Sequence, residues 1–226
     1  TGTIENDTTT EQETETQETQ PVSETDTSQE TTSPDVPQGM LQQNMKLENI
    51  DSTKPMVALT FDDGPCPENT NRILDELKQY HAHATFFVVG YNVDGNEDVI
   101  QRAAQDGNEI GNHTANHGKL RGIAPEDIPS LVTDLSDRIK GLTNQQYVPL
   151  RPPYGAIDDA VLAEIQDPVV LWSIDTLDWK TKNPEKTIEN VQNTVFDGSI
   201  ILMHDLYAES ADAAIQLISW LNEQGY

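Results

Sequence analysis

The stretch MVALTFDDG, residues Met56–Gly64, decides the fold, because it is an apolar run that ends abruptly in two acids and a glycine. Such a run predicts a short buried strand that leads directly into a loop. Further runs of this kind follow along the chain. They are ATFFVVG (Ala84–Gly90), NEIGNH (Asn108–His113), VPLRPPYG (Val148–Gly155), PVVLWSID (Pro168–Asp175) and SIILMHD (Ser199–Asp205).

Segments with helical spacing of apolar residues separate the expected strands. They are Glu68–Tyr80, Asp98–Gly107, Pro125–Leu142, Asp159–Gln166, Glu185–Val195 and Ser210–Tyr226. Regular alternation of strand and helix predicts an α/β fold with parallel strands, either a barrel or a doubly wound sheet. In a (β/α) barrel the carboxyl ends of all strands share one rim, where the polar ends of these runs would converge. We therefore expect the barrel.

The N-terminal part has a different composition. Residues 1–50 contain 11 acids and one base, Lys46. No Trp, Tyr, Phe, Lys or Arg occurs from Thr1 to Leu41. Such a segment cannot bury enough apolar surface to offset its ordering entropy. We predict that residues 1–38 are disordered and that 1–50 form an acidic linker or stalk, with a passive tail favoured over an O-glycosylated stalk. Residues 51–226 form the expected domain.

Charge and composition exclude several classes of protein. The 39 Asp and Glu outnumber the 13 Lys and Arg, which gives a net charge of −26. A polyanion of this kind repels nucleic acid and anionic membranes, so neither is an expected partner. No apolar run reaches the roughly 18 residues of a membrane span. A single cysteine, Cys66, excludes an intrachain disulfide framework and a cysteine-rich zinc module.

Two histidines and a pair of acids suggest a metal site. His113 and His117 are four residues apart, a spacing that lets two imidazoles reach one ion, although surface histidines show it too. Asp62 and Asp63 end the first strand, and adjacent side chains point in different directions. Asp63 could therefore join the histidines, while Asp62 faces the substrate. Three ligands of this type leave open positions, as in catalytic sites.

Other polar residues at expected strand ends could supply acid–base chemistry. Asp62 is placed to act as a base, and the planar guanidinium of Arg151 could hold it by a bidentate contact. His204 ends an apolar strand, where it is either a buried core histidine or a general acid. A carboxylate from Asp175 or Asp178 would keep His204 protonated at neutral pH.

On these residues the sequence resembles the polysaccharide deacetylases of the NodB-homology group, carbohydrate esterase family 4. The resemblance covers about residues 55–226 and includes the family's motifs in order. They are TFDDGP (Thr60–Pro65), HTANH (His113–His117), RPPYG (Arg151–Gly155), DTLDW (Asp175–Trp179) and LMHD (Leu202–Asp205). The resemblance implies a distorted (β/α) barrel.

The resemblance also implies a role for each matching residue. The catalytic residues would be Asp62 as base, Arg151 orienting it, His204 as acid and Asp178, preferred to Asp175, as its partner. Asp63, His113 and His117 would bind a divalent metal, Zn²⁺ with Co²⁺ as the alternative. The backbone amide of Tyr154 would stabilise the oxyanion, and Trp179 and Leu202 would line the pocket for the acetyl methyl group.

The chain departs from the family pattern at its end. Such domains usually have one more strand after the final helix, and this sequence stops at Gly225-Tyr226, so we expect a barrel that lacks its last strand. The loop after His204 also lacks a His-Pro pair that is often present there, so that side of the substrate groove is expected to differ from the family pattern.

The expected activity is metal-dependent removal of N-acetyl groups from N-acetylglucosamine units of a cell-wall polysaccharide, with release of acetate. Peptidoglycan is the first substrate expected, with chitin oligomers as the alternative. An O-deacetylase of acetylated xylan and an inactive wall-binding module remain the competing functions. We expect a monomer that is secreted or tethered to the cell surface.

Overall fold

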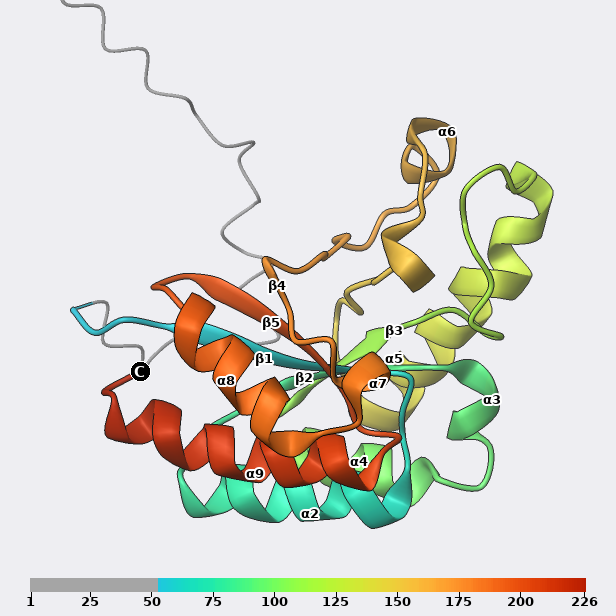
Figure 1. The fold of residues 1–226 in the computed structure, drawn as a ribbon. Helices are drawn as coiled ribbons and strands as arrows, with labels where there is room; N and C mark the ends of the chain where they lie inside the picture. The colour runs from blue at the N-terminus through green and yellow to red at the C-terminus, as the bar shows by residue number, and fades with distance from the viewer. Residues whose placement is uncertain (1–52) are drawn as a thin grey trace, which may run out of the picture. The chain divides into compact units, whose positions relative to one another are not determined.

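The computed structural model describes residues 53–226, so the predicted disordered segment 1–38 and linker 1–50 lie outside the described residues. Five strands form one parallel sheet in the order β3-β2-β1-β5-β4. They are β1 (Val57–Asp62), β2 (Thr85–Val88), β3 (Glu109–Asn112), β4 (Ile174–Asp175) and β5 (Ser199–His204). The parallel α/β class is therefore confirmed (Figure 1).

Single-residue bridges extend this sheet into a ring. Asn112 at the end of β3 pairs with Leu150, and Leu150 pairs with Val169, both in parallel. The chain then continues from Val169 into β4, which pairs with β5. Backbone pairing thus runs around a closed, irregular circuit of six segments within residues 53–226, which is compatible with a distorted (β/α) barrel.

The predicted strand Val148–Gly155 forms only these bridges. Pro149, Pro152 and Pro153 lack the N–H groups that a regular ladder needs. The predicted strand Pro168–Asp175 is shortened to β4 for a different reason. The carbonyl oxygens of Val170 and Leu171 accept hydrogen bonds from the Arg151 side chain, so they leave the ladder to hold that guanidinium.

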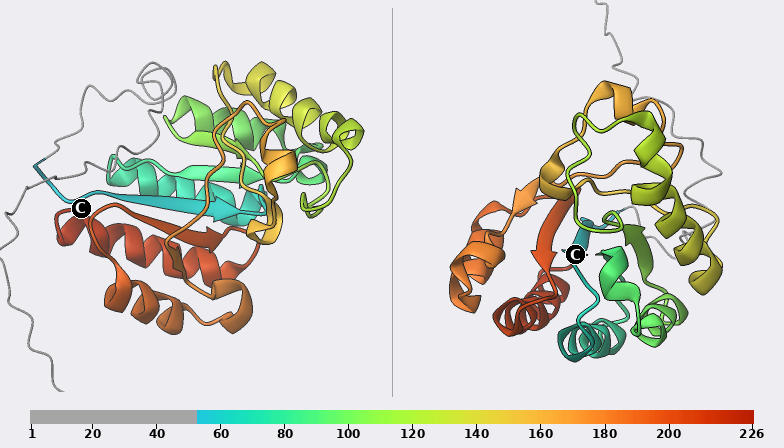
Figure 2. Two further views of the ribbon diagram at one scale, coloured as in Figure 1. Left: turned by 90° about the horizontal axis from the view of Figure 1, so that it is seen from above. Right: turned by 90° about the vertical axis from the view of Figure 1, so that its right-hand side faces the viewer.

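The α-helices of the described residues are α2 (Pro67–Gln79), α3 (Gly90–Val93), α4 (Glu97–Gln105), α5 (Asp134–Thr143), α6 (Asp159–Leu162), α7 (Asp178–Thr181), α8 (Pro184–Thr194) and α9 (Ala208–Glu223). The longer helices, α2, α4, α5, α8 and α9, lie along the outside of the strands (Figure 2), and shorter helices lie in the connections. The single helix predicted over Pro125–Leu142 is wrong in detail. It begins as a 3₁₀ turn and a π-helical turn around Pro129, which lacks an N–H to donate, and becomes α-helical only in α5.

Two apolar clusters hold the strands and helices together. The main cluster joins β1, β2 and β5 to α2 and α9, with Phe61 stacked on Phe86 at 5.1 Å between ring centroids. A smaller cluster supports the polar loops beyond β3 and includes Leu120, Val132 and Leu150. None of the described helices is long and apolar enough to cross a bilayer.

Candidate active site

Parallel strands bring the predicted site residues to one rim. Asp62 is the last residue of β1 and His204 the last of β5, and the two are directly paired in register. His113 follows the last residue of β3, and Arg151 follows Leu150, which is bridged to that same strand. Residues that are up to 142 positions apart in sequence therefore meet because the strand ends do.

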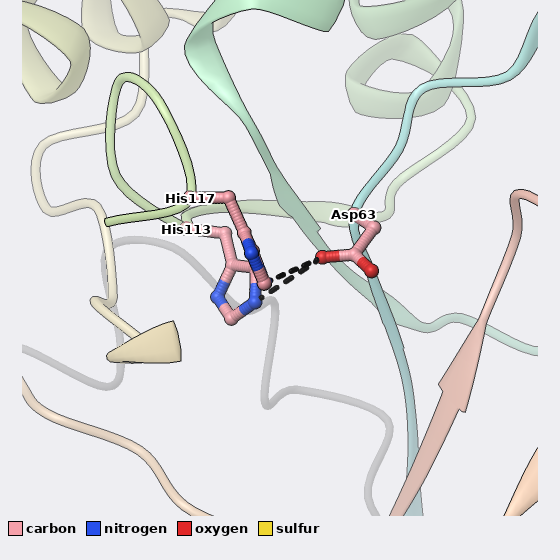
Figure 3. A group of neighbouring side chains, drawn as sticks. All are labelled: Asp63, His113 and His117. Atoms are coloured by element: carbon pink, nitrogen blue, oxygen red, sulfur yellow. Dashed lines mark ion pairs between the residues drawn. The ribbon is translucent and has the colours of Figure 1, made fainter. Parts of the chain in front are cut away.

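Asp63, His113 and His117 converge on one point (Figure 3). Asp63 Oδ1 lies 3.1 Å from His117 Nε2 and 3.4 Å from His113 Nε2. The three ligand atoms all lie within 4.8 Å of one another. Asp63 Oδ1 is buried and makes no hydrogen bond within residues 53–226, so both imidazoles face an unsatisfied carboxylate oxygen.

The protonation of this triad suits a divalent cation. His113 Nδ1 donates to the backbone carbonyl of Arg151 at 2.7 Å, which directs the lone pair of Nε2 toward Asp63. Burial lowers the pKa of His113 despite the nearby carboxylates, so its ring is neutral. Burial alone would raise the pKa of Asp63, but the contact with His117, assisted by His113 and His204, outweighs it and lowers that pKa. One oxygen and two nitrogens with open sides fit a catalytic metal site.

Backbone and amide contacts fix the position of the triad. Asn92 Nδ2, in α3, donates to the backbone carbonyl of Asp63 at 2.8 Å. Asn112 is fully buried, and its Oδ1 accepts from the Thr114 N–H at 2.7 Å, which shapes the loop between the histidines. Gly90 is required beside that loop, because a Cβ there would lie 2.8 Å from the Ala115 backbone.

Arg151 binds Asp62, as predicted from the sequence, but through one nitrogen rather than through the predicted bidentate contact. Arg151 Nη1 donates to Asp62 Oδ1 at 2.8 Å and to Thr60 Oγ1 at 2.7 Å. The guanidinium is fully buried and lies 4.1 Å from the centroid of the Phe87 ring. The second oxygen, Asp62 Oδ2, lies 3.6 Å from His113 Nε2. One oxygen of Asp62 is thus anchored, while the other faces the triad.

Asp178 forms two hydrogen bonds with His204. The ring Nδ1 of His204 lies 2.8 Å from Asp178 Oδ1, and the backbone N–H of His204 donates to Asp178 Oδ2 at 2.8 Å. Asp175 is not the contacting carboxylate, because its Oδ1 accepts from the Leu177 N–H instead. Burial would lower the pKa of His204, but Asp178, assisted by Asp62 and Asp63, outweighs it and raises that pKa. Nδ1 is occupied, so Nε2 remains available for substrate.

The three predicted substrate-contact residues have different surroundings. Leu202 is 4% exposed on β5, whereas Trp179 on α7 is 46% exposed. Tyr154 is 64% exposed, and its hydroxyl lies 3.3 Å from His117 Nδ1. Its ring meets the His117 ring edge-on at 4.9 Å between centroids. The phenol thus contacts a candidate metal ligand, which sequence reasoning did not anticipate.

Further residues at this rim were missed from sequence. Asn92 and Asn112 act on the triad through the backbone, and only their positions near the carboxyl ends of expected strands could have indicated them. Tyr91, in α3, is 57% exposed, and burial together with the charge of Asp63 raises its pKa. The charges of Asp63 and Tyr154 both act on its hydroxyl, which places Tyr91 beside the site.

Several site residues adopt left-handed backbone angles that only glycine adopts without cost. They include Asp63 at φ 76°, His117 at 58° and Tyr154 at 61°. Backbone strain of this kind persists where surrounding contacts hold it, and it is typical of functional sites. Here it aims the Asp63 and His117 side chains into the same space.

A family model described as "Polysaccharide deacetylase" matches residues 49–168. Among curated proteins, the chain is 41% identical over 181 residues to the peptidoglycan-N-acetylmuramic acid deacetylase PdaC of Bacillus subtilis, covering 80% of this chain and 39% of that protein. It is 34% identical over 174 residues to the peptidoglycan-N-acetylglucosamine deacetylase PgdA of Listeria monocytogenes, covering 77% and 37%. The chain thus spans about two fifths of the length of these relatives.

Solved structures give the same picture. The structure of PdaC superposes with a TM-score of 0.76 at 41% identity, covering 78% of this chain and 88% of that one. A family 4 acetyl xylan esterase from Clostridium thermocellum, in complex with a cobalt ion, superposes with a TM-score of 0.70 at 33% identity, covering 75% and 85%. The resemblance drawn from the sequence motifs is confirmed.

Proposed function

Since the chain belongs to the polysaccharide deacetylase family, we propose that it is a metal-dependent N-deacetylase of cell-wall glycans. It would remove acetyl groups from N-acetylated sugar units and release acetate. The observation that carries the proposal is the single rim on which an anchored carboxylate, a ligand triad and a His–Asp pair face one another. These are the parts that amide hydrolysis needs.

Asp63, His113 and His117 would hold the cation, with Zn²⁺ as the first candidate and Co²⁺ as the second. When bound, such a cation supplies Lewis acidity for the acetamide carbonyl and makes water more acidic. Asp62 is the proposed base. Its anchored Oδ1 sets the orientation, and its Oδ2, facing the triad, accepts the proton of the attacking water.

His204 is the proposed general acid. Its Nδ1 is bound to Asp178, so the proton on Nε2 can pass to the departing sugar nitrogen. The raised pKa of His204 favours the protonated form before the reaction. An amine is a poor leaving group unless it is protonated, which gives this pair a direct role in amide cleavage.

Remaining groups would bind and orient the acetyl group. The Tyr154 backbone amide is proposed to donate to the developing oxyanion. Trp179 and Leu202 are proposed to contact the acetyl methyl, Trp179 from the open surface and Leu202 from the buried wall. Both flank the His204 side of the rim.

Peptidoglycan is the proposed polymer, because the relatives named above act on it. Those relatives differ in acting on N-acetylmuramic acid or N-acetylglucosamine units. We propose N-acetylglucosamine units as the site of attack, with chitin oligomers as the alternative glycan. Such a substrate implies action outside the cytoplasm by a secreted or surface-tethered protein, which we propose works as a monomer.

A second candidate is O-deacetylation of acetylated xylan, which the similarity to a xylan esterase favours. The inactive wall-binding module is less favoured, because every residue of the proposed machinery is present and within reach of its partner.

The test measures acetate release from three substrates: peptidoglycan, an N-acetylglucosamine tetramer and acetylated xylan. The full chain is stripped of metal and then supplied with Zn²⁺ or Co²⁺. We expect acetate from the amide substrates, dependent on metal. Acetate release from xylan alone would show that the protein is an O-deacetylase of acetylated xylan. Release from none of the substrates would favour the inactive wall-binding module.

A further inference from the structure

Several Lys and Arg residues of this acidic protein closely follow candidate site residues in the sequence. Among described residues, six Lys and Arg side chains form ion pairs with carboxylates. Those that form no such pair within residues 53–226 are Lys54, Lys119, Arg121, Lys180, Lys182 and Lys186. Of these, Lys119 and Arg121 closely follow His117, and Lys180 and Lys182 closely follow Asp178. Within residues 53–226, Lys119, Lys180 and Lys182 therefore lie without an ion pair on segments that follow site residues. The charge of Arg121, by contrast, acts on Asp158, whose pKa is lowered mainly by backbone hydrogen bonds and further by that charge.

Lys119 is the cation with a structural link to the site. Its Nζ lies 5.4 Å from the centroid of the Tyr154 ring, within the range of a cation–π contact. Tyr154 in turn contacts the candidate ligand His117 through both its ring edge and its hydroxyl. Lys182 makes a similar contact with Tyr207 at 4.0 Å, but no contact joins Tyr207 to the triad among the described residues. The Tyr154 ring thus lies between Lys119 and the ligand triad and contacts both Lys119 and His117.

This arrangement has a clear electrostatic use. A net charge of −26 opposes the approach of an anionic polymer. At physiological salt this repulsion is screened beyond about 8 Å. The charged side chains within that distance of the bound polymer therefore determine whether the protein attracts or repels it. Lys119 is exposed, and no carboxylate within residues 53–226 forms an ion pair with it, so its ammonium is available to an anion of the substrate.

We propose that Lys119, supported by the Tyr154 ring, binds a carboxylate of the glycan, so that the preferred substrate is a carboxylated N-acetylated polysaccharide rather than a neutral one. This inference rests on the proposed deacetylase function and narrows its substrate class. A single ammonium matches one monovalent carboxylate. That carboxylate could belong to a lactyl ether on the sugar or to a peptide attached to it.

The test compares three probes of one chain length. The first is a tetrasaccharide of alternating N-acetylglucosamine and N-acetylmuramic acid with free lactyl carboxylates. The second carries the same lactyl groups as neutral methyl amides. The third carries peptides on the lactyl groups, so its carboxylates lie on the peptides. Comparing the first and third with the second identifies which carboxylate is bound.

The variants are Lys119→Ala, Lys119→Arg and, as a matched charge control, Lys186→Ala on α8. In Lys119→Ala we expect the ratio of kcat/KM for an acidic probe to that for the neutral probe to fall about 3- to 10-fold, the size of a partly exposed charge contact. Lys119→Arg should restore most of the ratio. Lys186→Ala removes the same charge elsewhere and should leave the ratio unchanged.

An equal loss on acidic and neutral probes, or an unchanged ratio, would overturn the carboxylate site. Failure of the deacetylase function itself would appear separately, as a wild-type chain that releases no acetate from any probe. In that case calorimetric binding of the acidic and neutral probes to the wild type and Lys119→Ala decides the inference. Equal affinities of both proteins for the acidic probe would reject it.

Discussion

Each oxygen of Asp62 has a different environment, and this asymmetry leads to a prediction. Asn at this position keeps an oxygen for Arg151 but cannot accept a proton from water. Asp62→Asn should therefore lower the rate of acetate release by about 10²–10⁴-fold, the usual contribution of a general base. Metal content, measured by elemental analysis, should stay at the wild-type level, because the ligand triad is intact. Loss of metal from this variant would show that Asp62 is a ligand rather than the base.

The His204–Asp178 contact predicts how activity depends on pH. The pKa of His204 is raised, so the acid form persists until the pH rises through that higher value, where activity should fall. Asp178→Asn removes the charge that raises the pKa, so the basic limb of the kcat profile should move to lower pH. The matched control is Asp175→Asn, which leaves the contact intact and should keep the limb in place.

A leaving-group comparison then separates an acid from a packing residue. His204→Ala should slow acetamide hydrolysis far more than aryl acetate hydrolysis, because a phenolate needs no protonation to leave. Equal slowing of both substrates would exclude the acid role.

At the scale of secondary structure, the short helix α3 serves the metal triad. Asn92 donates to the Asp63 carbonyl, and the Val89 N–H donates to the Gly64 carbonyl at 2.9 Å, so this turn clamps the loop that carries a ligand. Asn92→Ala should weaken Zn²⁺ affinity by about 10-fold, at the lower end of the effect of groups that orient ligands. Zn²⁺ affinity is measured by titration against a competing chelator. The control is Asn96→Ala, which removes a hydrogen bond to Asn92 but none to Asp63 and should leave the Zn²⁺ affinity unchanged.

Much of this architecture could be predicted from sequence at the level of elements. Apolar runs such as Val57–Asp62 and Ser199–His204 appear as strands because nothing in them interrupts a parallel ladder. Prediction failed where polar or proline residues redirect the backbone. The Arg151 side chain draws carbonyls out of one predicted strand, and prolines reduce another to a bridge at Leu150.

The same distinction applies to the site. Motif residues with side-chain chemistry, such as His113 and Asp178, could be found from their type and spacing. Asn92 and Asn112 act through backbone atoms of other residues, and Tyr154 contacts His117 through space. Contacts of this kind depend on tertiary placement, which composition and periodicity do not encode.

At the scale of the whole molecule, the candidate metal site joins two parts of the ring. Asp63 follows β1, while His113 and His117 belong to the loop after β3, with β2 between these strands. A cation bound here would add a link across the sheet that the unfolded chain lacks. Free cation at about 100 times its dissociation constant stabilises a native state by about 2.7 kcal/mol. We therefore predict that metal changes the stability of the domain as well as its activity.

For a chain of this size such a stabilisation corresponds to a rise of about 5–10 °C in melting temperature. Thermal unfolding followed by circular dichroism should show this rise when Zn²⁺ is added to the stripped protein, and chelation should reverse it. Asp63→Ala should abolish the shift, because it removes the ligand oxygen that both imidazoles face. Asp62→Asn should retain the shift while losing activity, since it leaves the ligand set intact. An equal shift in Asp63→Ala would mean that the stabilising cation binds elsewhere on this strongly acidic chain, and the triad would lose its assignment as the metal site.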